Sequence, residues 1–200
     1  MKKQLFLFSA VLLFFLSCGK SRTQEVDPNL FTAQEKAFIH ASDSDALMKL
    51  YTVNVYNDSL VLRNRCFNVI PKDASLEYLL SRMLQTVKNP LNLGVGIAAP
   101  QVGVNRRVMW VQRYDIPLKP WHAILNPKII AHSDTVQAGN EGCLSVPNAQ
   151  GSVDRWIWVT VEYDARNGQH IVEKITHAYT ARIFQHELDH LDRILYIDRL

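Results

Sequence analysis

The stretch His186-Glu187-Leu188-Asp189-His190 decides the fold, because it places two histidines four residues apart close to the C-terminus. On a helix these two imidazoles stand one above the other and can bind the same cation. Glu187 lies between them, where it can act as a general base on a water held by that cation. The pattern predicts the metal-binding helix of a hydrolase, from Thr176 or Tyr179 through Asp192. The alternative is a surface helix that happens to carry two histidines.

A catalytic metal site needs a third protein ligand, and only ten residues follow His190. None of these ten is His or Cys, and Asp192 is too close on the same helix to complete a tetrahedron. The third ligand is therefore expected upstream, where the candidates are His132, Glu141, Cys143, His170 and His177. Cys143 follows a glycine that permits close approach of a ligand, although a buried small apolar role is the alternative.

A second unusual segment is Gly94-Val95-Gly96-Ile97-Ala98-Ala99-Pro100-Gln101. Its first residues resemble a dinucleotide-binding loop, but it follows the helix breaker Asn89-Pro90 rather than a strand. Pro100 would also disrupt the helix that such a loop must open. A tight loop directed at a substrate is the better interpretation, with exposed backbone donors and the side-chain amide of Gln101.

From about Leu50 the sequence predicts an α+β domain, with antiparallel β-sheets packed around the C-terminal metal-binding helix and one further helix. The further helix is expected over Ser75–Lys88, where apolar residues recur at helical spacing. Ser75 is the expected N-cap, and Asn89-Pro90 is the expected stop.

Strands are predicted by runs of β-branched and aromatic residues separated by turn residues. Asn126-Pro127 is expected to form a turn, and Asn167-Gly168 a hairpin between the last two strands. The expected strands are Arg107–Gln112, Ala123–Leu125, Val153–Tyr163 and Ile171–Ile175.

The N-terminus has the pattern of a secretory signal. Lys2 and Lys3 precede an apolar run from Leu5 to Leu16, which is too short to span a membrane. The residues around Cys18 resemble a bacterial lipobox, although Phe15 is unusual at its first position. A plain signal peptide and an uncleaved anchor are the alternatives.

Cleavage at the lipobox would remove residues 1–17 as a signal peptide and leave a lipidated Cys18. We expect such a protein to be exported and held on the periplasmic or outer face of a bacterial membrane by its lipid. The polar residues that follow predict a tether or a short helix over 18–49, and the catalytic domain would occupy 50–200.

The charge balance gives no sign of a nucleic-acid partner. Formal net charge is +3, and it falls to +1 without Lys2 and Lys3, since 20 basic residues then face 19 acidic ones. With Cys18 assigned to lipid, Cys66 and Cys143 remain, and two cysteines do not make a disulfide framework.

The segments Gly94–Gln101, Glu141–Ser145 and Gln185–His190, in this order, resemble the three signature motifs of the peptide deformylase family. Each motif is modest alone, but the ordered set is specific. The resemblance extends to Asp58–Arg63 and Tyr196–Leu200, so it covers essentially the whole domain.

The resemblance implies a metal-dependent hydrolase that removes the formyl group from N-formylmethionyl peptides by attack of a metal-bound water. Cys143, His186 and His190 would bind one divalent metal ion, typically Fe2+, with Zn2+ or Ni2+ as substitutes. Glu187 would take the proton from the water and pass it to the leaving amine. The oxyanion would be stabilised by two donors, the Leu144 backbone N–H and the Gln101 side-chain amide.

The resemblance also implies how a monomeric enzyme would hold its substrate. The peptide would pair as an added strand with four backbone positions, Gly94, Gly96, Glu141 and Gly142. A methionine side chain would enter an apolar pocket lined in part by Val95, Tyr179 and Ile183.

Two features depart from the family pattern. Arg193 stands where the family commonly has a glycine, so we expect a different helix end there. The export signal is harder to reconcile, because deformylation normally acts on nascent chains in the cytoplasm. Two alternatives therefore stay open: a zinc peptidase or amidase acting on another acyl-peptide, and a non-catalytic peptide-binding lipoprotein.

Overall fold

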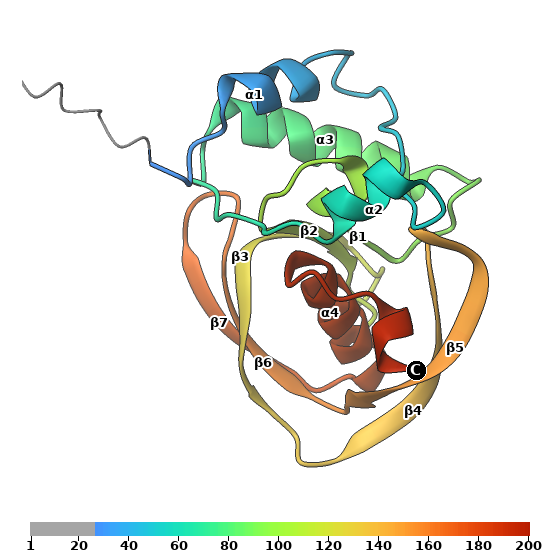
Figure 1. Cartoon of the computed structure of the whole chain (residues 1–200). Helices are drawn as coiled ribbons and strands as arrows, with labels where there is room; N and C mark the ends of the chain where they lie inside the picture. The colour runs from blue at the N-terminus through green and yellow to red at the C-terminus, as the bar shows by residue number, and fades with distance from the viewer. Residues whose placement is uncertain (1–26) are drawn as a thin grey trace, which may run out of the picture.

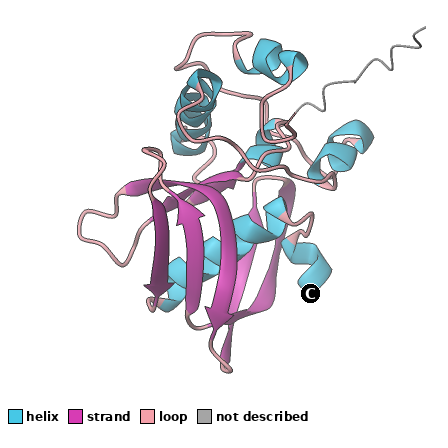
Figure 2. Cartoon of the chain, turned by 90° about the vertical axis from the view of Figure 1, so that its left-hand side faces the viewer, coloured by secondary structure: helices cyan, strands magenta, loops and turns pink. Residues whose placement is uncertain are grey.

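Two antiparallel sheets surround helix α4 (Ala178–Leu191) in the computed structural model, which describes residues 27–200 (Figures 1 and 2). The larger sheet has five strands in the order β1-β2-β3-β6-β7, and the smaller one pairs β4 with β5. The predicted fold class is confirmed. The strands are β1 (Gly96–Ala98), β2 (Val108–Gln112), β3 (Trp121–His132), β4 (Val136–Cys143), β5 (Val146–Trp156), β6 (Val159–Asp164) and β7 (His170–Ile175).

Both helices that the periodicity predicts are present. Helix α4 begins after His177, whose side chain accepts a hydrogen bond from the Thr180 backbone N–H. Helix α3 (Ala74–Lys88) buries its apolar stripe against the sheet, but Asp73 rather than Ser75 is its N-cap. The Asp73 carboxylate accepts the Ser75 backbone N–H at 2.8 Å, and the Ser75 hydroxyl contacts the His40 ring instead.

Two short helices, α1 (Ala33–Ile39) and α2 (Tyr56–Leu62), accompany α3 on the same side of the molecule (Figure 1). Helix α2 was not predicted, because it has seven residues and no side-chain cap. Helix α1 lies within the segment expected to be a tether or a short helix. Residues 27–49 do not extend away from the domain, since Phe31, Ile39 and Met48 are buried in the same core as α3.

Arg106 explains why this segment packs onto the domain. Its buried guanidinium bonds to both carboxylate oxygens of Glu35, at 2.7 and 2.6 Å. It also donates to the backbone carbonyls of Pro28 and Leu30, each at 2.6 Å. One side chain from the region before β2 thus fixes the segment that precedes α1. The expected signal peptide and Cys18 lie outside the described residues.

The strand expected over Val153–Tyr163 is in fact the end of β5 and the start of β6, which belong to different sheets. The chain changes sheets at Ile157, whose backbone N–H donates to the Ser133 hydroxyl at 3.0 Å. The hairpin predicted at Asn167-Gly168 is confirmed between β6 and β7.

The turn expected at Asn126-Pro127 was also wrong, because β3 continues through it. Asn126 has a φ of +53°, and the pairing of β3 with β6 shifts between Leu125 and Lys128. A bulge of this kind accommodates a proline that has no N–H to donate. Within residues 27–200, no helix is long and apolar enough to cross a membrane.

Candidate metal centre and active-site cleft

Three potential ligand atoms, from Cys143, His186 and His190, lie within 4.8 Å of one another. Cys143 ends β4, and the two histidines project from consecutive turns of α4. The Cys143 Sγ and the His190 Nε2 are 3.2 Å apart. A thiolate with two imidazoles is a ligand set that suits Zn2+ and several other divalent ions.

The other upstream candidates for the third ligand lie elsewhere. His132 stacks on Trp156 with ring centroids 3.7 Å apart, and His170 contacts Asp164 on the β6–β7 hairpin. His177 caps α4 through its Nδ1 atom. Of the five candidates, the structure therefore brings Cys143 to the two histidines, with Glu141 beside them in a different role.

Glu141 orients His186 through a hydrogen bond of 2.8 Å between its Oε2 atom and the ring Nδ1. Arg155 donates to both Glu141 oxygens at 2.9 Å, and Arg182 donates to Oε1 at 2.8 Å. Burial acts to raise the pKa of Glu141, but these partners outweigh it and hold the pKa well below its usual range. The carboxylate stays charged and leaves the His186 Nε2 atom for a metal.

The pKa of the Cys143 thiol is also well below its ordinary value. Burial alone would raise it, but the charges of His190 and His186 act in the opposite direction and prevail. The thiolate is the form in which a cysteine binds a metal.

Arg155, Arg182 and Asp189 complete this charged network, and the sequence analysis gave none of them a role. Arg155 donates to Asp189 at 2.5 Å as well as to Glu141. Arg155 and Glu141 are 14 residues apart, and Arg155 and Asp189 are 34 apart. No helical or strand spacing in the sequence indicates pairs of this kind.

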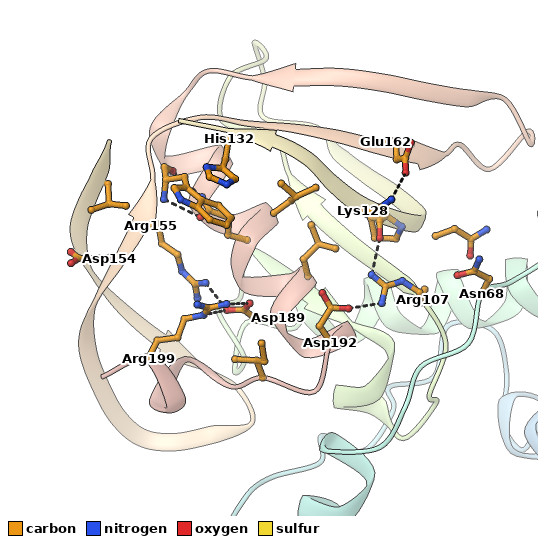
Figure 3. A pocket seen from close by; sticks show the side chains of 18 residues that line it. Asn68, Arg107, Lys128, His132, Asp154, Arg155, Glu162, Asp189, Asp192 and Arg199 are labelled. Carbon is orange, nitrogen blue, oxygen red and sulfur yellow. Dashed lines mark hydrogen bonds and ion pairs between the residues drawn. The ribbon is translucent and has the colours of Figure 1, made fainter. Parts of the chain in front are cut away.

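A cavity of about 810 Å3 lies beside α4, at the face of the helix that carries Asp189 (Figure 3). Arg155 connects this cavity to the metal centre, because its guanidinium contacts Asp189 (Figure 3) and also Glu141, the partner of His186. Four cations that line the cavity are paired with carboxylates, in the pairs Arg107–Asp192, Lys128–Glu162, Arg155–Asp189 and Arg199–Asp189.

Glu187 is buried beside the ligand set, and its Oε2 atom has no partner among the described residues. Burial raises its pKa to about 7, with a further contribution from the negative charges of Cys143 and Glu141. Gly96 makes room for this carboxylate, since a Cβ at that position would collide with it. A carboxylate with a pKa near neutrality is well matched to accepting and returning a proton.

Gln101 reaches the same place from the 3-10 helix η1 (Ala99–Val102). Its Oε1 atom accepts the Ala98 backbone N–H at 2.8 Å, which orients the amide. Its Nε2 atom lies 3.6 Å from the Cys143 Sγ and 3.3 Å from the Ser145 hydroxyl. The segment expected to be a tight loop is therefore β1 followed by η1, and it delivers an amide donor to the ligand set.

A cleft of about 980 Å3 runs between β1, the β4–β5 turn and α4. His190 is buried beneath the cleft rather than lining it. All the other residues predicted for the site line this cleft: Gly94, Val95, Gly96, Gln101, Glu141, Gly142, Cys143, Leu144, Tyr179, Ile183, His186 and Glu187.

A ligand set of one thiolate and two imidazoles, beside a buried carboxylate on the central helix of an α+β fold, defines the class of metal-dependent hydrolases. The model of the family described as Polypeptide deformylase matches residues 50–200. The chain belongs to the peptide deformylase family, as the resemblance in its sequence implied. Members of this family use one divalent metal ion, and Cys143, His186 and His190 form a group that could hold it.

Similar proteins agree with this assignment. The peptide deformylase of Thermotoga petrophila is 36% identical over 151 residues, which are 76% of this chain and 87% of that protein. Peptide deformylase 2 of Nostoc sp. is 42% identical over 134 residues, which are 64% of this chain and 73% of that protein.

Solved structures show the same fold. The crystal structure of peptide deformylase from Thermotoga maritima has a TM-score of 0.69 at 32% identity, and covers 78% of this chain and 98% of that one. The Met-Ala-Ser-bound class I type b deformylase from Acinetobacter baumannii has a TM-score of 0.68 at 31% identity, and covers 78% and 99%.

Proposed function

We propose that this protein removes the formyl group from N-formylmethionyl peptides. The observation that carries the proposal is the convergence of the Cys143, His186 and His190 donor atoms with the Glu187 carboxylate and the Gln101 amide at one cleft. Membership of the peptide deformylase family supports the same reaction.

We assign each of these residues a role in the proposed reaction. A divalent ion held by Cys143, His186 and His190 would lower the pKa of a water and polarise the formyl oxygen. Glu187 accepts the proton that the attacking water loses and delivers it to the nitrogen of the leaving peptide, so that formate and a free amine result. Gln101 Nε2 and the Leu144 backbone N–H donate to the oxygen of the formyl group as negative charge develops there.

We assign peptide binding to two strand edges that face the cleft. β1 pairs only with β2, and β4 pairs only with β5, so each has one edge without a strand partner among the described residues. An extended peptide that adds to these edges would run along Gly94–Gly96 and Glu141–Gly142. The methionine side chain would lie against Val95, Tyr179 and Ile183, and the peptide bound to the Acinetobacter baumannii deformylase supports a peptide ligand.

The test is a formate-release assay with matched formyl-Met and acetyl-Met peptides. Metal-loaded protein should release formate and leave the acetylated peptide intact, and Glu187→Ala should abolish release. Cleavage of the acetylated or unmodified peptide would favour a peptidase or amidase. Binding without turnover would favour a non-catalytic module, and either result would overturn the proposal.

We also propose that residues 1–17 are a signal peptide, that Cys18 carries lipid and that the catalytic domain of residues 50–200 is thereby held on a membrane surface. The support is the basic start, the apolar run from Leu5 to Leu16 and the small residues around Cys18. In cells given a labelled fatty acid, the protein should carry the label and sediment with membranes. Cys18→Ser should remove the label, and a label that persists in this variant contradicts the proposal.

A further inference from the structure

The three most exposed large apolar side chains within residues 27–200 are leucines that lie in two loops. Leu118 is 100% exposed, Leu91 is 91% exposed and Leu93 is 84% exposed. Single apolar residues on a surface are ordinary, but a group of them at one place marks an interaction site. What matters is therefore whether the three leucines lie together.

The two loops leave the five-stranded sheet at the same end. β1 and β2 are antiparallel neighbours, so the segment before β1, which carries Leu91 and Leu93, lies beside the loop after β2, which carries Leu118. At this end of the pair the Gln112 backbone N–H donates to the Val95 carbonyl at 2.9 Å. We call the three leucine side chains the leucine rim.

The leucine rim borders the cleft. Leu93 is among the residues that line the cleft, whereas Leu91 and Leu118 are not. In the second loop the Tyr114 ring packs edge-on against Tyr179, with the ring centroids 4.8 Å apart, and Tyr179 also lines the cleft. A surface that covers the leucine rim would therefore meet the mouth of the cleft.

The fold itself gives no reason for leucine at two of these positions. Leu93 has a φ of +50° and Leu118 has a φ of +66°, in the left-handed region that favours glycine and asparagine. Both side chains are largely in water, so no packing within the chain offsets this strain. An exposed apolar residue that is kept in a strained conformation indicates a contact outside the fold.

The charges beside the leucine rim are positive. Lys88 and Lys119 are exposed, and neither belongs to an ion pair among the described residues. Lys119 instead places its Nζ atom 4.7 Å from the centroid of the Tyr114 ring. The acidic residue of these loops, Asp115, is already paired with the buried Arg113. The two free lysines therefore favour an anionic partner.

We propose that the leucine rim docks on a bilayer that contains anionic lipids, so that the cleft opens at the membrane surface. Leucines would enter the acyl chains, and the lysines would lie at the anionic headgroups. Lysine is depleted at the interfaces of protein complexes, so the lysines favour a bilayer over a protein partner. The choice of a bilayer also rests on the proposed lipid at Cys18, but it does not require the proposed reaction.

The test uses residues 18–200 with Cys18→Ser, a chain that contains every element described above but carries no lipid at that position. This chain should sediment with vesicles of equal parts of phosphatidylglycerol and phosphatidylethanolamine, and less with vesicles of phosphatidylcholine alone. Leu91→Asn together with Leu118→Asn should lower the partition constant roughly 10-fold or more. Asparagine tolerates a positive φ and neither leucine loses packing, so the variant should fold.

Val172→Asn is the matched control, since Val172 is 58% exposed but lies on β7, at the opposite edge of the sheet from β1. This variant should bind the vesicles as tightly as the parent chain. No sedimentation of the parent chain, or an equal loss of binding in both variants, overturns the proposal. Self-association that the leucine variant abolishes, without vesicle binding, would assign the rim to a second copy of the chain instead. The assay measures no turnover, so its failure is distinct from a failure of formate release.

Discussion

Glu141 is the residue on which the orientation of the ligand set depends. It holds the His186 ring through Nδ1 and is itself held by two arginines that lie on β5 and α4. A ligating histidine needs such a partner to fix its tautomer and its ring orientation. The Glu141 carboxylate therefore acts on the ligand set through His186.

Replacing Glu141 with Gln should weaken Zn2+ binding by about 10- to 100-fold, because the partner of His186 loses its charge and one acceptor. Chelator competition measures the change. Asp115→Asn is the control, since Asp115 also pairs with an arginine, Arg113, but is not among the residues that line the cleft. Equal affinity in Glu141→Gln and the unmodified protein would show that the hydrogen bond to His186 does not orient the ligand.

Arg193 follows the C-cap of α4 and has a φ of +70°, in the left-handed region that favours glycine. The different helix end that we expected at Arg193 is therefore wrong, because the backbone adopts the left-handed conformation that a glycine there would take. Arg193→Gly should raise the free energy of unfolding by about 0.5–1 kcal/mol, because it relieves the Cβ strain at some cost in chain entropy. Urea unfolding measures this.

A matched change, Arg65→Gly, replaces an arginine whose φ is not positive and should give no gain. A loss of stability in Arg193→Gly would mean that contacts of the arginine side chain outweigh the strain.

The site residues could be predicted because three short motifs carry them, each with its own spacing. His186, Glu187 and His190 follow from one helical turn. The supporting residues Arg155, Arg182 and Asp189 could not be predicted, because an ion pair between β5 and α4 leaves no periodic trace in the sequence.

Among the secondary-structure elements, the periodicity of apolar residues predicted the two longer helices and most of the strands. The predicted bounds were wrong where contacts between distant parts of the chain decide where an element ends. The sequence predicts β5 and β6 as one strand because both are rich in β-branched and aromatic residues. Hydrogen bonds that join Ile157 and Trp158 to the segment between β3 and β4 separate them. β3 was expected to stop at Pro127, but a bulge allows it to continue. Helix α1 is held by Arg106, which lies in a distant part of the chain.

The pairing of α1 with Arg106 should make stability depend on pH through Glu35. Burial opposes ionisation of Glu35, but its bonds with Arg106 and Thr32 prevail, and its pKa lies below the ordinary value of 4.5. The lowered pKa stabilises the folded state above pH 4.5, and this contribution is lost as pH falls through the folded-state pKa. Glu35→Gln should therefore lower stability by about 1–3 kcal/mol at pH 7, and by less in acid.

Thermal unfolding of both proteins between pH 3 and pH 7 measures this difference. Glu77→Gln is the control, because Glu77 pairs with Arg166 at an exposed site where such a pair contributes little. A difference between Glu35→Gln and the unmodified protein that is the same at pH 3 and pH 7 would contradict the linkage.

For the whole molecule, the ligand set and the expected location favour different metals. A thiolate and two imidazoles accept iron, zinc or nickel, and the family typically uses Fe2+. Outside the cytoplasm, a thiolate bound to Fe2+ is open to oxidation. Cys143 is half-buried and is among the residues that line the cleft, from which an oxidant can approach it.

We therefore expect the native metal to be zinc, or a mixture, rather than iron alone. Elemental analysis of protein isolated from its own membrane fraction, without added metal, measures this directly. Protein expressed without residues 1–17, and purified from the soluble fraction without added metal, serves as the comparison and should contain more iron. Iron as the only metal in the membrane fraction would refute the expectation.

The bond between Arg106 and Glu35 joins residues 71 positions apart, and this separation sets an order of events during synthesis. A ribosome that adds about 5–20 residues per second makes Arg106 roughly 4–14 seconds after Glu35. For that interval the core that Phe31 and Ile39 enter is incomplete, because β2, which contributes Val108 and Trp110 to it, has not yet been made. The segment that precedes α3 thus waits for its partners, and it stays accessible to chaperones and proteases until β2 emerges.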